Sequence, residues 1–350
     1  LPFYNPDVSL GAAPRAPTED EPDPEPAAPP TNAPTHEIFL QVEHGVTATQ
    51  SSIRPSSFDR ISEPFTATAF AWGMQTSGAN IGPLGIAFTP DGRSVIISGG
   101  AGRNELFRFT YAGGPADTPW STLDSPVYDM TFDTDGRLWA TTGGGALVEI
   151  DPETGAILHR HNDGITLGLA ADPDAPRLFV ATRNGIEVFD TRTAEFTPFS
   201  STRVDGLGLA PDGTLWGATW PDNGQIVRFN ARGEPEVMLN LEHEAEALAF
   251  GPVGTPLEGL LFVSHAEGGE LTLVELASMQ QTALATGGTR GDFLHFGPDG
   301  RLYVIQSDQV DVVHLLADPR VLLTDPANGA NLATPPHTAN VTFDQDMLED

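Results

Sequence analysis

Short runs of alternating apolar and polar residues recur along the middle of the chain at a nearly constant spacing. Each copy has an apolar segment, a tight polar turn and a second apolar segment, then a Gly- or Asn-containing turn and a third segment. A looser fourth segment closes most copies. This alternation is typical of β-strands, and these turns are typical of hairpins. The middle residues of the first turns are Asp91, Asp135, Asp174, Asp212, Val253 and Asp299.

The repeat has the length and strand content of a β-propeller blade. Successive turns lie 38 to 46 residues apart, and a four-stranded repeat of about 40 residues is typical of such blades. We therefore predict an all-β, six-bladed β-propeller with four-stranded blades over residues 65–318. One column of the second strand is mostly large and is expected to fill the space between blades: Ile96, Trp139, Phe179, Trp216, Phe262 and Tyr303.

The sixth copy shows three clear strands, so its fourth strand must come from elsewhere. The apolar segment 65–72 precedes the first copy, and we predict that it is the closing strand of the last blade, which would remove an exposed sheet edge. Residues 37–64 are poorly defined, with one expected strand in EIFLQVEH. A degenerate seventh blade within 37–64 is the alternative.

The two ends of the chain differ from the repeats. Residues 1–36 hold ten of the 31 prolines and few large apolar side chains, so we expect a disordered linker there. Residues 319–350 contain the turn 325–330 and the strand 341–347, and they resemble the start of an SbsA-type bacterial Ig-like domain. The resemblance implies a truncated Ig-like domain and neighbouring Ig-like modules in the same chain.

Composition narrows the range of partners. The chain has 48 acidic and 17 basic residues, a formal net charge of −31 and no cysteine. Such a polyanion repels nucleic acid, and no apolar run is long enough to span a bilayer, so we expect neither nucleic-acid binding nor membrane insertion. The absence of cysteine excludes disulfides and thiolate metal sites. Together with the two ends, this composition predicts an extracellular or cell-envelope location.

Two copies carry a motif found in other propellers. The segments PLGIAFTPDGRSVIISGG and GLGLAPDGTLWGATWPDNGQIVRF resemble repeats of the NHL, SMP-30/gluconolactonase and streptogramin-lyase-like group. The resemblance implies a fold and leaves the activity open, because propellers carry hydrolases, lyases and binding modules alike. For the gluconolactonase family it implies calcium held at the channel by Glu, Asn and Asp. This chain has Leu84 where that family tends to carry Glu.

Carboxylates recur where the chain enters the first strand of a copy, at the expected mouth of the central channel. We predict that four carboxylates meet there and bind a metal: Asp129, Asp205, Glu246 and Asp292. Ca²⁺ is the candidate metal, because it prefers carboxylate oxygens. Solvated loop ends in a very acidic chain are the alternative. Seven residues before the middle of each turn, the copies have Leu84, Tyr128, Leu167, Asp205, Glu246 and Asp292.

Histidines offer a second set of candidates. A streptogramin-lyase-like His/Glu constellation could draw on His243, Glu244, His265 and Glu267, although these residues do not map onto the family motif. We expect His265 on a surface loop. Strand alternation places His295 in the interior, which predicts a hydrogen-bonded core histidine. No catalytic residue can be assigned from the sequence.

These observations favour a non-catalytic propeller module of a larger secreted or cell-surface bacterial protein. The module would bind an unknown protein, peptide or glycan ligand, or act as a structural head. The alternative is a calcium-dependent lactonase- or lyase-like enzyme, with its site at the mouth of the central channel.

Overall fold

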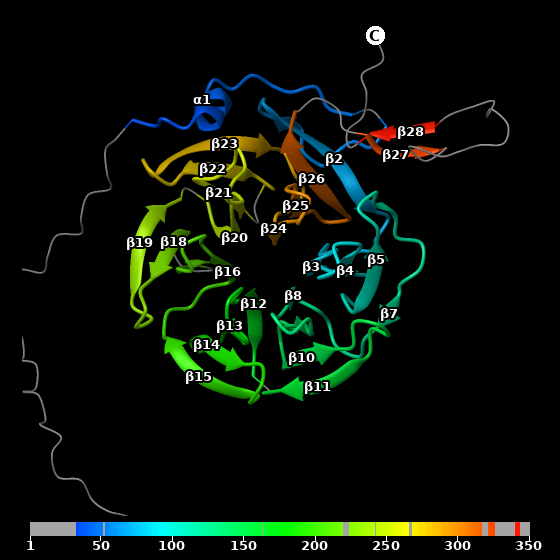
Figure 1. The fold of residues 1–350 in the computed structure, drawn as a ribbon, viewed down its shortest axis with the longest axis vertical. Coiled ribbons are helices and arrows are strands. Elements are labelled where there is room, and N and C mark those ends of the chain that lie inside the picture. The colour runs from blue at the N-terminus through cyan, green and yellow to red at the C-terminus, as the bar shows by residue number, and fades with distance from the viewer. Residues whose placement is uncertain are drawn as a thin grey trace, which may run out of the picture.

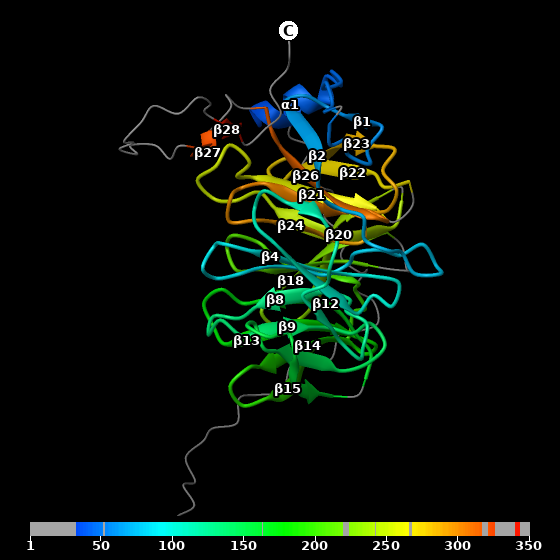
Figure 2. The same ribbon diagram turned by 90° about the vertical axis from the view of Figure 1, so that its right-hand side faces the viewer.

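The computed structural model describes residues 33–51, 53–162, 164–219, 224–241, 243–265, 268–316, 321–325 and 340–343. Six antiparallel sheets lie around a central axis (Figure 1), and Figure 2 shows the same ring from the side. This arrangement confirms the predicted all-β, six-bladed propeller. Most of the expected linker, residues 1–32, lies outside the described part of the chain.

Each blade consists of four main strands, named here from the channel outward. Blade one contains β3 (Ile86–Phe88), β4 (Val95–Gly99), β5 (Glu105–Phe109) and β7 (Ser121–Thr122). Blade two contains β8 (Met130–Phe132), β9 (Leu138–Ala140), β10 (Leu147–Ile150) and β11 (Ile157–His161). Blade three contains β12 (Thr166–Ala171), β13 (Arg177–Thr182), β14 (Gly185–Asp190) and β15 (Glu195–Ser200).

The second half of the ring repeats this order. Blade four contains β16 (Gly206–Leu209), β17 (Leu215–Ala218), β18 (Gln225–Phe229) and β19 (Pro235–Asn240). Blade five contains β20 (Ala245–Phe250), β21 (Leu260–His265), β22 (Leu271–Glu275) and β23 (Gln280–Thr286). Blade six contains β24 (Leu294–Phe296), β25 (Leu302–Ile305), β26 (Gln309–Leu315) and β2 (Phe65–Trp72).

Strand β2 closes the ring, as the sequence predicts. It pairs antiparallel with β26, and the short strand β6 (Gly114–Pro115) after blade one pairs parallel with it. Phe70 of β2 packs edge-on against Tyr303 of blade six and Phe109 of blade one, with ring centroids 4.9 and 6.0 Å apart. The start of the folded chain thus holds the last blade against the first.

The column of large side chains fills the space between neighbouring blades. Trp139 of blade two packs against Phe189 of blade three, with ring centroids 5.2 Å apart. Tyr303 of blade six meets Phe88 of blade one at 5.0 Å. The same contact to the following blade joins Trp216 to Phe250 and Phe262 to Phe296. Each blade is a small sheet that would expose apolar surface on its own. Burial of this column between neighbouring blades removes that surface from water and stabilises the ring.

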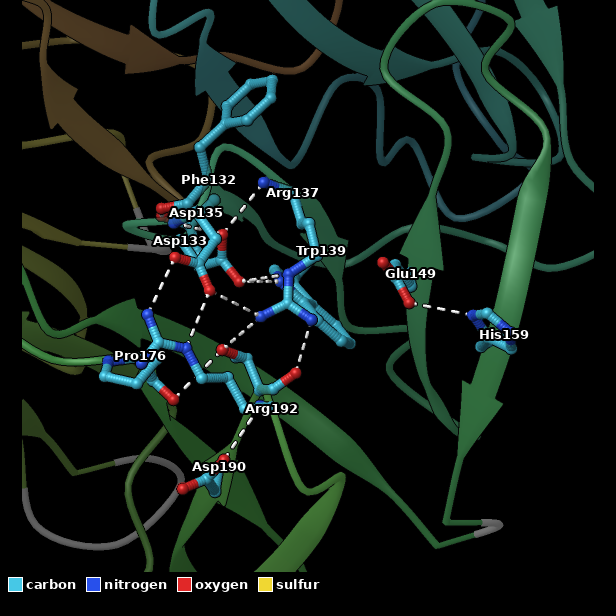
Figure 3. Close-up of polar contacts among 12 residues, drawn as sticks. Phe132, Asp133, Asp135, Arg137, Trp139, Glu149, His159, Pro176, Asp190 and Arg192 are labelled. Atoms are coloured by element: carbon cyan, nitrogen blue, oxygen red, sulfur yellow. Dashed lines mark hydrogen bonds and ion pairs between the residues drawn. The ribbon is translucent and has the colours of Figure 1, made fainter.

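Polar contacts add to this packing between blades two and three (Figure 3). The Arg137 guanidinium binds Asp133 of its own blade, Nε to Oδ2 at 3.0 Å, and donates from Nη2 to Thr191 Oγ1 of blade three at 2.8 Å. Arg192 of blade three reaches back to Asp135 of blade two, with Nη2 and Oδ1 3.0 Å apart. Side chains of both blades therefore fix their relative position.

Residues 37–64 differ from the prediction. The segment expected as a strand forms the helix α1 (Glu37–Glu43), because Ile38, Phe39 and Val42 share one helical face and are buried beside β22 and β23. Strand β1 (Arg60–Ile61) adds a fifth strand to blade five. The described residues of 37–64 form no sheet of their own, so the seventh-blade alternative is wrong. Among the described residues, no helix has the length and apolarity needed to cross a membrane.

The C-terminal segment contributes a separate pair of strands. Strands β27 (Val321–Asp325) and β28 (Asn340–Phe343) pair antiparallel, and β28 overlaps the start of the strand expected at 341–347. Most of the predicted turn at 325–330 lies outside the described residues. An Ig-like domain that starts here stays a prediction.

Candidate functional site

The innermost strands of blades four, five and six place a carboxyl group at the same end of the channel. Asp205 directly precedes β16, Glu246 is the second residue of β20, and Asp292 lies two residues before β24. Gly206 allows the close approach of the first two, because a Cβ at this residue would lie 2.3 Å from the Glu246 carbonyl oxygen. The sequence therefore brings Asp205 and Glu246 together through a residue with no side chain.

Asp205 and Glu246 form a buried carboxyl pair. The two residues are 2% and 4% exposed, and each carboxyl group acts on the pKa of the other, so the two lie close together. Tyr128 of blade two donates its hydroxyl to Asp205 Oδ2 at 2.5 Å. Among the described residues, no N–H or hydroxyl donates to Asp205 Oδ1, which is buried. This oxygen is thus available for a shared proton or a cation.

Burial changes the ionisation of this pair. Burial raises the pKa of Glu246 to about 9, and the charges of Asp205 and Asp292 add to the effect. Burial likewise raises the pKa of Asp205, although its hydrogen bonds to Tyr128 and Glu246 oppose the rise. Two adjacent buried anions repel each other. At neutral pH the pair therefore needs either one shared proton or a bound cation.

Tyr128 and Arg290 lie over the carboxyl groups as half-buried residues. Burial and the nearby Asp205 raise the pKa of Tyr128, so its hydroxyl remains a donor at neutral pH. Arg290 binds Asp292 through Nε, at 2.6 Å to Oδ1 and 2.5 Å to Oδ2, and its side chain is 32% exposed. Burial raises the pKa of Asp292 even though the Arg290 guanidinium opposes the rise. The site thus contains a phenol and a guanidinium beside its carboxyl groups.

Arg103 adds a second positive charge near Asp292. It lies in the loop between β4 and β5, and its charge acts on the Asp292 carboxyl group. Its φ of 55° is unusual for a residue with a side chain. Such strained positions cluster at functional sites. The sequence alone gives no signal for this conformation.

Asp129 is near enough for its charge to help raise the pKa of Asp205, but backbone amides occupy both of its carboxyl oxygens. Its Oδ1 accepts the Met130 N–H at 2.8 Å, and its Oδ2 accepts the Leu169 N–H of blade three at 2.9 Å. Asp129 therefore links two innermost strands. The charges of Asp129, Glu246 and Asp292 all act on this end of the channel, and metal binding by the four carboxylates stays a prediction.

His295 faces the channel, which corrects the expected core histidine. Its Nε2 lies 3.5 Å from Asp129 Oδ1, and its side chain is 28% exposed. It lines a cavity of about 350 Å³ that lies between the innermost strands of the six blades. The alternation of β24 was correct, but the side of the strand that seemed internal opens onto this cavity.

The histidines of blades four and five belong to a different cavity. His265 is the last residue of β21 and is 2% exposed, so the expected surface loop is wrong. Its Nε2 lies 2.9 Å from Thr272 Oγ1, and its ring centroid lies 6.3 Å from that of His243. Both line a cavity of about 250 Å³ between the two blades, away from the carboxyl pair. Glu267 lies outside the described residues.

The carboxyl pair fits part of a calcium site. Among the described residues, no three Asp, Glu or His side chains converge as a ligand set. Asp129 and Asp292 are engaged by backbone amides and by Arg290. Asp205 and Glu246 remain, and Asp205 Oδ1 lacks a donor. Since calcium takes six to eight oxygen ligands, these residues would supply only part of its shell.

Two residues of the site escaped the sequence prediction. Tyr128 occupies the same turn-to-strand column as Asp205 and Glu246, but as a neutral residue it gave no sign of a charge cluster. Arg290 stands two residues before Asp292 and could have been found as the cation nearest to a predicted ligand. The position seven residues before the middle of each turn therefore indicates which residues reach the site, whereas a search for acidic residues alone misses Tyr128.

Comparison with known proteins finds similarity to several enzymes. No family model matches the chain. A 6-deoxy-6-sulfogluconolactonase from Pseudomonas putida is 27% identical over 224 residues, which cover 58% of this chain and 72% of that protein. A gluconolactonase structure from Xanthomonas campestris has a TM-score of 0.60 and 12% identity, and the match covers 83% of this chain and 98% of that one.

A third similar protein carries a different activity on the same fold. The soluble aldose sugar dehydrogenase of Escherichia coli has a TM-score of 0.57 and 13% identity, and the match covers 72% of this chain and 99% of that one. At such identities the two solved structures show a common fold only.

The prediction of a non-catalytic module is wrong. The curated relative is a lactonase, and it supports the hydrolase alternative over a binding or structural head. The resemblance to SMP-30/gluconolactonase propellers is confirmed. Surface charge and the chain ends indicate location and partners, but the activity depends on the channel, where the buried carboxyl pair lies.

Proposed function

We propose that this protein hydrolyses lactones of sugar acids, and that the reaction takes place at the end of the channel beneath Tyr128 and Arg290. The observation that carries the proposal is the buried pair of Asp205 and Glu246. The similarity to a sulfogluconolactonase supports the choice of a sugar-acid lactone as substrate.

The pair can both accept and donate a proton, as lactone hydrolysis requires. Water adds to the carbonyl carbon, and the bond from that carbon to the ring oxygen breaks. One group must take a proton from the water and another must give a proton to the departing oxygen. In the Asp205–Glu246 pair, the ionised member accepts the first proton and the protonated member donates the second. The pair ends the reaction with one proton, as it began.

The groups above the pair are suited to orient the substrate. The Arg290 guanidinium contacts Asp292 through Nε, so its Nη groups are the donors for the substrate, whereas the Tyr128 hydroxyl donates to Asp205 and holds that carboxyl group in place. Donors fixed near a carbonyl oxygen stabilise the negative charge that develops there when water attacks. Asp292 fixes the Arg290 guanidinium through Nε and thereby orients its remaining N–H groups.

Calcium would occupy this pair in place of the shared proton, so it is an alternative to the acid–base step and not a part of it. Asp205 and Glu246 are the residues that would hold the ion, because the other two carboxylates are already engaged. When bound, calcium would polarise the lactone carbonyl as a Lewis acid.

Hydrolysis of glucono-δ-lactone tests the proposal. The rate is measured at neutral pH from the acid that the reaction releases. Glu246→Gln and Asp205→Asn are each expected to lower kcat by about 100-fold or more, the range for loss of a general acid or base. Glu195→Gln, at an exposed acid on β15, serves as the matched control and should keep the wild-type rate. A folded wild-type protein with no rate above the uncatalysed reaction would contradict the proposal.

A further inference from the structure

An arginine recurs at one position of the repeat. In blades two, three and six, an arginine at or just before the start of the second strand lies two residues before the large-residue column, and each guanidinium lies 5.5 to 5.6 Å from the ring in that column. Each Nε also contacts a carboxylate of its own blade, at 2.6 to 3.0 Å. The three side chains therefore share one orientation. The arginines are Arg137, Arg177 and Arg301, and their carboxylate partners are Asp133, Asp172 and Asp299.

Two of these arginines connect their blade to the next one. Arg137 donates to Thr191, which directly follows β14 of blade three. Arg301 donates from Nη2 to the carbonyl oxygen of Tyr111, two residues after β5 of blade one, at 2.9 Å. In both cases the acceptor comes just after the third strand of the following blade.

Arg177 lacks the corresponding contact. Its Nε binds Asp172 Oδ2 at 2.7 Å, but none of the described residues accepts a hydrogen bond from its Nη atoms. The segment that would provide the acceptor follows β18 of blade four, at Asn230 and Ala231. Here a cavity of about 580 Å³ lies between the blades, and Arg177, Asn230 and Ala231 are among the residues that line it.

The walls of this cavity are apolar and its rim is charged. Phe179 and Phe199 stack edge-on with ring centroids 5.4 Å apart, and Phe229 continues the aromatic wall 6.2 Å from Phe199. Arg228 at the rim is paired with Glu236. A cavity of several hundred Å³ with apolar walls and a few polar groups is the usual form of a small-molecule site.

We propose that this cavity binds a small organic monocarboxylate with an apolar body, at a site separate from the channel. The carboxylate binds the Nη atoms of Arg177, where Arg137 and Arg301 bind an acceptor of the next blade. The apolar body packs against Phe179, Phe199 and Phe229. Guanidinium groups bind carboxylates through parallel N–H bonds, so the exposed edge of Arg177 suits this group.

The surrounding charges favour one negative charge on the ligand. Arg228 is already compensated by Glu236, and Asp212 also lies on the rim. A second anionic group would meet these carboxylates and the strongly negative molecule as a whole. A neutral amide would lose the charge-assisted bonds to Arg177.

Titration calorimetry with phenylacetate tests the site. Wild-type protein is expected to bind phenylacetate, and Arg177→Gln should weaken that binding by about tenfold or more, as expected for loss of a hydrogen bond to a charged group. Arg137→Gln removes the same side chain from a bridged position and should leave the affinity unchanged. Glu246→Gln should also leave it unchanged, because the channel end is a separate site. Phenylacetamide and acetate, which lack the charge or the ring, should bind at least several-fold more weakly.

Three results would overturn the proposal. The first is no binding of phenylacetate to folded wild-type protein at millimolar concentration. The second is equal affinity of wild type and Arg177→Gln, which would place the ligand elsewhere. The third is equal affinity for phenylacetate and phenylacetamide, which would show that the Arg177 charge is not used.

Discussion

Two buried carboxyl groups of this protein, those of Glu246 and Asp311, have different surroundings. Glu246 faces another carboxyl group, and burial raises its pKa to about 9. Asp311 of β26 instead receives hydrogen bonds from Ser57 N at 2.8 Å and Gln309 Nε2 at 2.6 Å. Burial still raises the pKa of Asp311 to about 7. The first group is suited to proton transfer, and the second fixes the segment before β2.

The Asp311 carboxyl group gives stability a specific pH dependence. Its pKa is raised in the folded protein, so between about pH 4 and about pH 7 the folded state binds more protons than the unfolded state. Its contribution to the unfolding free energy is present at acidic pH and is lost as the pH rises through that window. Asp311→Asn removes this dependence. The Tm of the variant minus that of wild type should therefore increase from about pH 5 to about pH 8.

Thermal unfolding at several pH values measures this difference. Loss of one of the two hydrogen bonds shifts the Tm of Asp311→Asn at every pH, so the change with pH is the informative quantity. Asp117→Asn, at an exposed residue, is the control and should follow wild type throughout. A difference between Asp311→Asn and wild type that stays constant across the range would contradict the assignment.

Calcium and the shared proton compete for Asp205 and Glu246. Because a ligand that binds only the native state raises its stability, calcium should raise the Tm of wild type. The rise should be larger at about pH 9 than at about pH 6, where the pair retains its proton. The Asp205→Asn/Glu246→Gln double variant should show no rise. No calcium effect on wild type at either pH would remove the metal from the proposal and leave the acid–base pair in place.

Individual elements show which parts of the sequence were readable. Strand β2 was predicted with its observed bounds because the sixth copy shows three strands and the apolar segment 65–72 directly precedes the first copy. Helix α1 was predicted as a strand because Ile38, Phe39 and Val42 fit a helical face as well as a short apolar run. The deciding factor was contact with β22 and β23, which the local sequence does not contain.

In the site, too, some residues were predictable from the sequence and others were not, and a shift of one residue separates the two cases. Glu246 and Asp205 were located by their distance from the turn, and the structure brings them together. Asp129 comes one residue later than this column, and successive residues of an extended chain point to opposite sides. Tyr128, in the column, therefore contacts Asp205, while Asp129 binds backbone amides of the channel wall.

Strand β2 should control the stability of the ring through Phe70. This side chain is 2% exposed and contacts aromatic rings of the first and the last blade. Phe70→Ala is expected to lower the unfolding free energy by about 3–5 kcal/mol, the usual cost of removing a buried phenylalanine. Leu158→Ala, at a 49% exposed position on β11, should change it by less than about 0.5 kcal/mol. Denaturant unfolding that shows equal losses for both variants would contradict this role of β2.

The whole molecule brings the site together from distant parts of the chain. Tyr128 comes from blade two, Asp205 from blade four and Glu246 from blade five, and their contact exists only in the closed ring (Figure 1). The net charge of −31 acts on the same scale, because repulsion among acids opposes the compact state.

Salt should therefore stabilise the protein. Raising NaCl from about 0.01 M to about 0.15 M shortens the screening length from about 30 to about 8 Å, which weakens repulsion across the surface. The surface ion pairs of the arginines also weaken, but acids outnumber basic residues 48 to 17. We expect the Tm to rise over this range in NaCl and equally in KCl. A Tm that falls would show that the ion pairs outweigh the repulsion.

The pH dependence of lactone hydrolysis tests the central claim most directly, since that claim joins the carboxyl pair to the reaction. After subtraction of the uncatalysed rate, kcat of wild type should be high near neutral pH and fall as the pH rises through about 9, where the pair loses its shared proton. Glu246→Gln should have a low rate with no such fall. A wild-type kcat that stays constant through this range, or a Glu246→Gln variant with the wild-type profile, would contradict the account.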